Sequence, residues 1–129
     1  MRAVCLRCPS VALGLAPLAS RSFAASTLEV RAISINGVWP SGPVAIGAGA
    51  LQQNTIGCLN TAVGWQALNL VGSAIQNTAV GACALYVNTG CQNTAIGVLA
   101  MQCNCLGCQN TAVGFLAGQC FNTGCANTF

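Results

Sequence analysis

Cysteine is the residue type in this sequence that could carry chemistry. The chain of 129 residues has ten cysteines, and two of them, Cys5 and Cys8, lie near its start. The other eight follow much later along the chain: Cys58, Cys83, Cys91, Cys103, Cys105, Cys108, Cys120 and Cys125. Three of these form a C-x-C-x-x-C segment, from Cys103 through Cys105 to Cys108, and clustered thiolates are the ligands that soft metal ions prefer. This segment is a candidate metal site, with Cys91 or Cys125 as a candidate fourth ligand.

The cysteines are also spaced regularly along the chain. Cys103 and Cys120 are 17 residues apart, and Cys91, Cys108 and Cys125 follow one another at the same interval. If the chain folds with this period, each of these cysteines lies beside its equivalent. The candidate disulfides are then Cys103–Cys120 and either Cys91–Cys108 or Cys108–Cys125. Disulfides require an oxidising compartment.

A third interpretation makes the cysteines packing residues without chemistry. Leu70 and Val87 occupy the position of Cys103 in earlier copies of the period, and Ile75 occupies the position of Cys91. A cysteine that shares a position with leucine, valine and isoleucine behaves as a small apolar side chain. The sequence leaves the packing, disulfide and metal interpretations open.

Almost all other catalytic chemistry is excluded by the distribution of charge. The formal net charge is +3, and the five charged residues all lie within the first 31 positions: Arg2, Arg7, Arg21, Glu29 and Arg31. No Asp, Glu, Lys, Arg or His occurs from Ala32 onward, so paired carboxylates, histidine bases and lysine nucleophiles are excluded there. We expect a protein that is not an enzyme, has no cofactor, and does not bind nucleic acid.

Residues 1–26 resemble a targeting segment because they contain arginine, alanine, leucine and serine but no acidic residue. One interpretation is a secretory signal peptide, which predicts a secreted or cell-surface protein. Another is a mitochondrial-type transit peptide, since Arg21, Phe23 and Ser26 match an R-x-F-x-x-S pattern. A third is an untargeted leader. The apolar stretch of this segment is interrupted by Pro17 and is shorter than the ~20 residues that a transmembrane helix needs.

Residues 27–42 are predicted to link this leader to the rest of the chain and to form a capping strand. Leu28, Val30 and Ala32 alternate with polar residues, which is typical of a strand. Asn36-Gly37 is a turn signal, and Pro40 follows shortly after it.

Residues 43–129 are built from a repeat. The pattern Asn-Thr-Ala-Val/Ile-Gly begins at positions separated by 17, 16 and 17 residues: Asn60, Asn77, Asn93 and Asn110. A related copy ends at Gly47, and a last, incomplete copy begins at Asn127. A unit of this length cannot bury an apolar face alone, so successive copies must stack.

Stacked copies predict an all-β fold, a parallel β-solenoid of about five coils of 16–17 residues each. Equivalent residues would then form ladders along the stack, and asparagine amides in register would hydrogen-bond to one another. The predicted asparagine ladder is Asn60, Asn77, Asn93 and Asn110, and the predicted threonine ladder is Thr61, Thr78, Thr94 and Thr111. We assign the apolar ladder to the solenoid core: Ile46, Val63, Val80, Ile96 and Val113.

The repeat resembles a known family. Residues 44–50, Val-Ala-Ile-Gly-Ala-Gly-Ala, are similar to the V-A-I-G-x-x-(S/A) core of YadA-like head repeats, found in trimeric autotransporter adhesins and related fibre proteins. The resemblance covers about residues 43–129, although the unit is longer than usual and contains eight cysteines. It implies a left-handed β-roll, a parallel homotrimer, and a role in adhesion or fibre structure at the cell surface. The receptor is unknown, and no catalytic residues are implied.

We therefore expect a non-enzymatic structural or adhesive repeat module. The alternatives are a cysteine-rich solenoid that binds ice or a soft metal, and a repeat fragment without a dedicated function. A regular threonine ladder favours ice binding. The missing T-x-T doublet, and the shared side of threonine and the valine assigned to the core, argue against it.

Overall fold

The computed structural model describes residues 30–32, 42–120 and 123–129. The predicted leader, residues 1–26, and most of the predicted linker, residues 27–42, lie outside these ranges. The repeat region predicted from the sequence is described almost completely.

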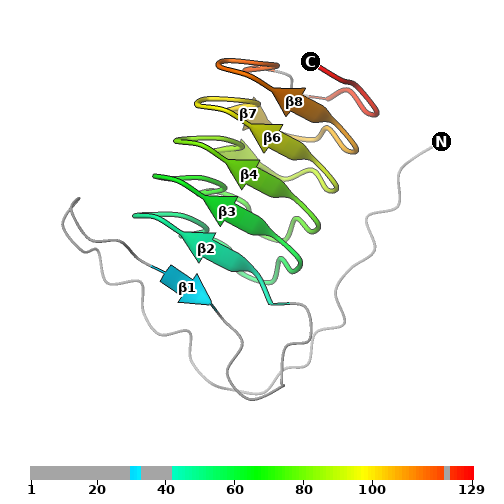
Figure 1. The fold of residues 1–129 in the computed structure, drawn as a ribbon. Coiled ribbons are helices and arrows are strands. Elements are labelled where there is room, and N and C mark those ends of the chain that lie inside the picture. The colour runs from blue at the N-terminus through cyan, green and yellow to red at the C-terminus, as the bar shows by residue number, and fades with distance from the viewer. Residues whose placement is uncertain (1–29, 33–41, 121–122) are drawn as a thin grey trace.

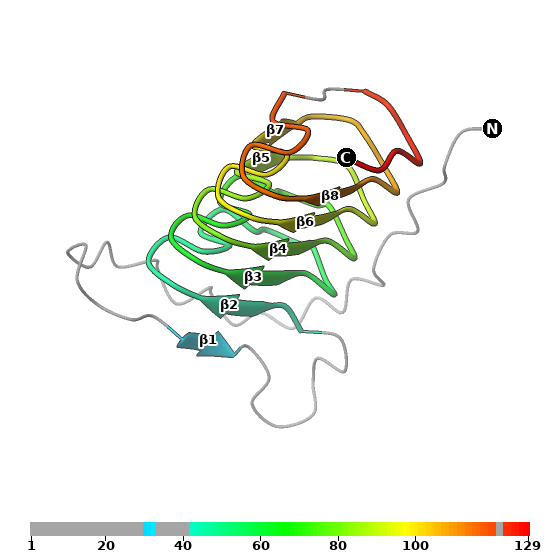
Figure 2. The same cartoon turned by 45° about the horizontal axis from the view of Figure 1, so that its top comes forward.

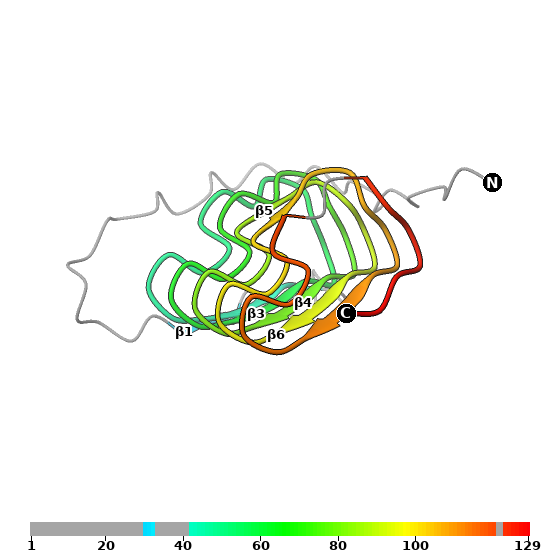
Figure 3. The same cartoon turned by 90° about the horizontal axis from the view of Figure 1, so that it is seen from above.

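One parallel sheet runs through the whole solenoid. Its strands are β2 (Val44–Ile46), β3 (Thr61–Val63), β4 (Thr78–Val80), β6 (Thr94–Ile96) and β8 (Thr111–Val113), stacked in that order (Figure 1). A second, shorter sheet pairs β5 (Val87–Asn88) with β7 (Cys103–Asn104). The coils have similar outlines and follow one another along the stack, and β5 lies across the coil from the larger sheet (Figures 2 and 3).

These strands confirm the predicted fold class. The described residues contain only strands, turns and loops, and the coils form a parallel β-solenoid of about four turns between β2 and β8. The five strands of the stack correspond to the four complete copies of the motif and the related copy that ends at Gly47.

Equivalent residues pair directly across neighbouring coils. Thr61 pairs with Thr78, which pairs with Thr94, which in turn pairs with Thr111. The step of 16 residues between Thr78 and Thr94 leaves this register intact. The motif therefore fixes the register, and the missing residue is absorbed elsewhere in the coil.

The strands face the opposite way from the expected one. The sequence predicts that the apolar ladder lies in the core, and this prediction is wrong. Val80, Ile96 and Val113 are 37%, 42% and 59% exposed. Ile46 and Val63 are half-buried. The middle residue of each strand is buried instead: Ala45, Ala62, Ala79, Ala95 and Ala112.

The asparagines explain this correction. Residues i and i+2 of a strand share a face, so Thr and Val lie on one side, and Asn and Ala lie on the other. Asn60, Asn77, Asn93 and Asn110 are at most 1% exposed. Burying an amide is tolerated when its hydrogen bonds are satisfied. Large apolar side chains reach the core from the turns rather than the strands, namely Leu68, Leu85 and Met101.

A further strand covers one edge of the large sheet. β1 (Val30–Ala32) pairs with β2 in the antiparallel sense, with Arg31 opposite Ala45. An unpaired parallel edge would present free N–H and C=O groups to other chains, and β1 occupies that position for β2.

A column of glycines forms the turn after each strand. Gly47, Gly64, Gly81, Gly97 and Gly114 have φ between 124° and 136°. A Cβ atom on Gly81 would lie 2.4 Å from the carbonyl oxygen of Gly97, which is closer than atoms can approach. Glycine is required here by both the backbone conformation and the close approach of the next coil.

The glycine column gives a stability test. Gly81→Ala introduces both an unfavourable φ and a steric clash with the next coil. Gly114→Ala introduces a similar φ, but the nearest atom to its Cβ is that of Ala117 at 3.8 Å. We expect Gly81→Ala to lower the free energy of unfolding by about 1–3 kcal/mol more than Gly114→Ala.

Thermal unfolding followed by circular dichroism measures this difference, which corresponds to roughly 5–15 °C in Tm for a domain of this size. Equal losses in the two variants would show that the coils do not approach as closely as the structure indicates.

Candidate functional site

The outer surface of the large sheet is the most regular surface of the molecule. We define the Thr–Val face as the outward residues of its parallel strands: Val44, Ile46, Thr61, Val63, Thr78, Val80, Thr94, Ile96, Thr111 and Val113. On each strand the two outward residues are about 6.6 Å apart, and neighbouring strands are about 4.8 Å apart. The face is a two-dimensional array of methyl and hydroxyl groups.

No charge interrupts this array. The sequence has no acidic or basic residue after Arg31, so the face binds neither through salt bridges nor through long-range electrostatic attraction. Surface valine and isoleucine side chains that are 37–59% exposed make the face strongly apolar for a solvent-facing sheet. Its chemistry favours a partner that is itself uncharged and flat.

The buried asparagine ladder holds the face rigid. The backbone N–H of Asn77 donates to Oδ1 of Asn60 at 3.0 Å, and the N–H of Asn93 donates to Oδ1 of Asn77 at 2.9 Å. The same contact joins Asn110 to Asn93 and Asn127 to Asn110. Each asparagine therefore fixes the coil that follows it, directly before the threonine of the Thr–Val face.

A second, shorter asparagine stack was not found from the sequence. Asn104 Nδ2 donates to Oδ1 of Asn88 at 2.9 Å, and both residues are fully buried. Each also donates to a glycine carbonyl, that of Gly90 or Gly107. The Oδ1 atom of Asn104 is buried without a partner. Their 16-residue spacing was a usable signal, but Val71 occupies the position one coil earlier and hides it.

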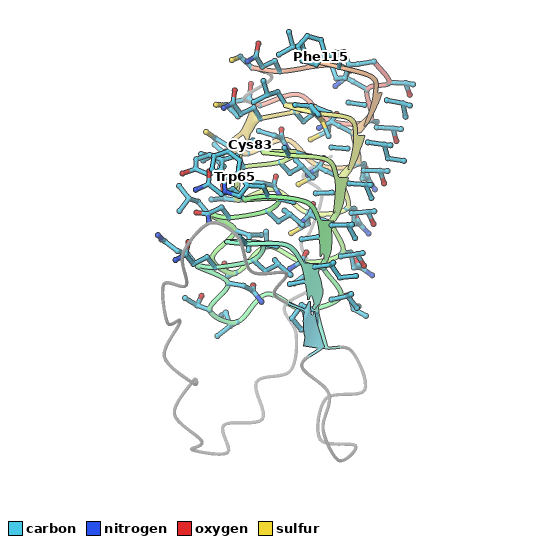
Figure 4. The ribbon with its side chains drawn as sticks, turned by 60° about the vertical axis from the view of Figure 1, so that its left-hand side comes forward. Trp65, Cys83 and Phe115 are labelled. Atoms are coloured by element: carbon cyan, nitrogen blue, oxygen red, sulfur yellow. The ribbon has the colours of Figure 1, made fainter. Side chains whose placement is uncertain are left out.

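An apolar ridge borders the Thr–Val face at the turns. Trp65, Val98 and Phe115 follow the glycine of their coils and are 53%, 45% and 71% exposed. Figure 4 shows Trp65 and Cys83 side by side on neighbouring turns, where the N–H of Cys83 donates to the carbonyl of Trp65 at 2.8 Å, and Phe115 on a later turn. The ridge is irregular, because Ala82 occupies the same position in the coil between Trp65 and Val98.

The structure separates the cysteines into two groups. Cys58 and Cys91 are buried and disulfide-bonded. The free thiols among the described residues are Cys83, Cys103, Cys105, Cys108, Cys120 and Cys125. Of the predicted disulfides, Cys103–Cys120, Cys91–Cys108 and Cys108–Cys125 are therefore not formed in this structure, since each pair includes a free thiol.

The predicted metal site is also not assembled. Within the described part of the chain, no three cysteine, histidine or acidic side chains gather closely enough to hold a metal ion. Cys103 belongs to β7, whereas Cys105 and Cys108 lie in the loop that follows it. The Cys108 Sγ atom instead accepts a hydrogen bond from the N–H of Cys91 at 3.3 Å. The C-x-C-x-x-C spacing does not bring all three thiols together: Cys105 is near enough to Cys103 to help raise its pKa, but the Cys108 sulfur is engaged elsewhere.

Two thiols are held in the neutral form. Burial raises the pKa of Cys83, whose thiol also contacts Oε1 of Gln66 at 3.9 Å. Burial is also the main cause that raises the pKa of Cys103, and the adjacent Cys120 thiol adds to it. Because the thiolate is the reactive form, the raised pKa lowers the reactivity of both thiols at neutral pH.

The asparagine ladder gives a second stability test. Asn93→Ala removes bonds from Nδ2 to Asn77 Oδ1 and to the Gly107 carbonyl, at 3.2 and 2.8 Å, and leaves the N–H of Asn110 without its acceptor. We expect a loss of about 2–4 kcal/mol in the free energy of unfolding. Denaturant unfolding measures it, with Gln53→Ala on the exposed surface as the control. A loss no larger than that of the control would contradict the role given to the ladder.

Comparison with known proteins adds no family. None of the residues that the structure describes belongs to a helix long and apolar enough to cross a membrane. No family model, no curated protein and no solved structure matches this chain. The resemblance to YadA-like head repeats therefore rests on the repeat motif alone.

Proposed function

We propose that this protein is a non-enzymatic structural or adhesive module of a fibre or cell-surface protein, and that other copies of the same chain cover its Thr–Val face. The observation that carries the proposal is the exposure of the valine and isoleucine ladder along an uncharged, in-register sheet. The homotrimer is the assembly that the resemblance to YadA-like head repeats implies.

The chemistry of the face favours a second copy as its occupant. Exposed rows of valine and isoleucine on a soluble protein are costly unless they are covered. Two such faces meet without charge repulsion, since neither carries a charged side chain. Their equal strand spacing also lets the side chains of one face pack between those of the other over several coils.

The regularity of the face also supports a function. All four complete Asn-Thr-Ala-Val/Ile-Gly copies keep threonine and a β-branched apolar residue at their outward positions. The neighbouring exposed position, which Trp65, Ala82, Val98 and Phe115 occupy, has diverged freely. β-Propensity accounts for β-branched residues in general. It does not account for the order, with threonine first in four of the five strands and valine or isoleucine second in all five.

Ice binding is the second candidate function, and one observation favours it. The sequence-based objection was that threonine shares its side with core valine, but the structure places both residues outward. The result is a flat, rigid array of hydroxyl and methyl groups at two fixed spacings, a suitable template for ordered water. Ice binding and self-association would compete, because both would occupy the Thr–Val face.

Self-association is tested by a charge on the face. Ile96→Lys places an ammonium group within the array, on the fourth of its five parallel strands, where an interface would bury it without a partner. We expect the native chain to form an oligomer of three chains and the variant to weaken association by at least about a hundredfold. Size-exclusion chromatography with light scattering measures both masses.

The matched controls are Leu106→Lys and Ile56→Lys, which add the same charge at sites that are 66% and 62% exposed and lie outside the face. Both controls should assemble like the native chain. A native chain that stays monomeric, or a control that dissociates as readily as Ile96→Lys, would rule out the proposed interface.

Ice binding is tested on the monomeric fraction. If the second candidate is correct, the native chain produces thermal hysteresis, and Thr94→Lys removes most of it, because a strongly hydrated ammonium disturbs the flat array. Leu106→Lys should retain the activity. Absence of thermal hysteresis in the monomeric fraction of the native chain would rule out ice binding.

A further inference from the structure

One column of the solenoid brings two free thiols together. Leu70 pairs with Val87, and Val87 pairs with Cys103 in the short sheet. The same backbone contact continues to the next coil, where the N–H of Cys103 donates to the carbonyl of Gln119 at 2.9 Å. Cys120 therefore stands above Cys103. Neighbouring coils are about 4.8 Å apart, within the Cα–Cα range of disulfides.

The Cys120 thiol lies near that of Cys103. After burial, its nearness is a further cause of the raised pKa of Cys103, and both thiols are free, with Cys103 half-buried and Cys120 exposed. The adjacent glutamines keep the coils aligned, since Gln119 Nε2 donates to Gln102 Oε1 at 3.0 Å.

Cys108 and Cys125 provide a contrasting pair in the same coils. Their backbones are equally close, because the N–H of Ala126 donates to the carbonyl of Cys108 at 3.0 Å. The Cys108 sulfur, however, contacts the N–H of Cys91 and the carbonyl of Leu106 instead of the next coil. Backbone spacing alone therefore does not select a pair. Cys103 with Cys120 is favoured because the Cys108 sulfur is already engaged away from Cys125.

We propose that Cys103 and Cys120 are a dithiol site that forms an inter-coil disulfide by exchange with a low-molecular-weight disulfide such as oxidised glutathione. The exposed Cys120 thiolate attacks one sulfur of the reagent and releases one thiol. The Cys103 thiol then loses its proton and attacks the Cys120 sulfur of the mixed disulfide, which releases the second thiol. Two protein thiols are oxidised to one disulfide, and one reagent disulfide is reduced to two thiols.

The crosslink would fix successive coils at a position that the buried asparagine ladder does not reach. It closes a loop of one repeat, which restricts the unfolded chain. Two cysteines in register on adjacent coils already have the backbone spacing of a disulfide, so the crosslink should stabilise the solenoid rather than strain it.

The full chain is treated with oxidised glutathione, its remaining thiols are alkylated, and its disulfides are then reduced and labelled with a second reagent. Mass spectrometry of chymotryptic peptides should assign the second label, acquired on oxidation, to Cys103 and Cys120. Oxidation should also raise Tm by roughly 5–10 °C.

Cys120→Ser should abolish that rise, whereas Cys125→Ser, in the same coil, should retain it. Peptide mapping of the native chain decides the assignment even if a variant folds poorly. The proposal is overturned if Cys103 and Cys120 acquire only the first label after oxidation, or if Cys108 and Cys125 are oxidised in their place.

Discussion

The whole structure depends on hydrogen bonds between buried asparagine amides of successive coils. Each Oδ1 atom accepts the N–H of the asparagine in the next coil, at 2.9–3.0 Å from Asn60 to Asn127. An amide can occupy the core only when it is satisfied there, so each coil must sit in register with the next one. Register, strand direction and the choice of inner face all follow from this requirement.

The choice of inward-pointing residues determines which side chains of the strands lie on the outer surface. Since asparagine and alanine point inward, the strands contribute only small or amide side chains to the core, and Leu68, Leu85 and Met101 must fill it from the turns. These three residues have φ between 45° and 48°, a left-handed conformation that is costly for a large side chain. Their complete burial offsets this cost. Because these residues fill the core, the β-branched residues of the strands can lie on the outer surface.

The sequence predicts the repeat architecture because periodicity is a long-range signal. The recurring Asn-Thr-Ala-Val/Ile-Gly motif is sufficient to predict parallel strands, and the structure contains them at each complete copy. Hydrophobicity alone predicts the wrong inner face for the strands. It ranks Val80 above Asn77 as a core residue, but Asn77 is buried and Val80 is exposed. The cost of burying an amide depends on its partners, and these are visible only once the coils are stacked.

The cysteines show the same limit at the level of single side chains. The 17-residue spacing predicts which cysteines lie in one column, but both Cys103–Cys120 and Cys108–Cys125 satisfy it. What separates the pairs is that the Cys108 sulfur contacts the N–H of Cys91 and the carbonyl of Leu106, a side-chain choice that periodicity does not encode. Side-chain orientation also decides the role of the outer face. The recurring threonine and valine can contact a partner only because both side chains reach solvent. In a repeat protein of this kind, sequence period determines which residues are neighbours, and side-chain orientation determines which neighbours interact.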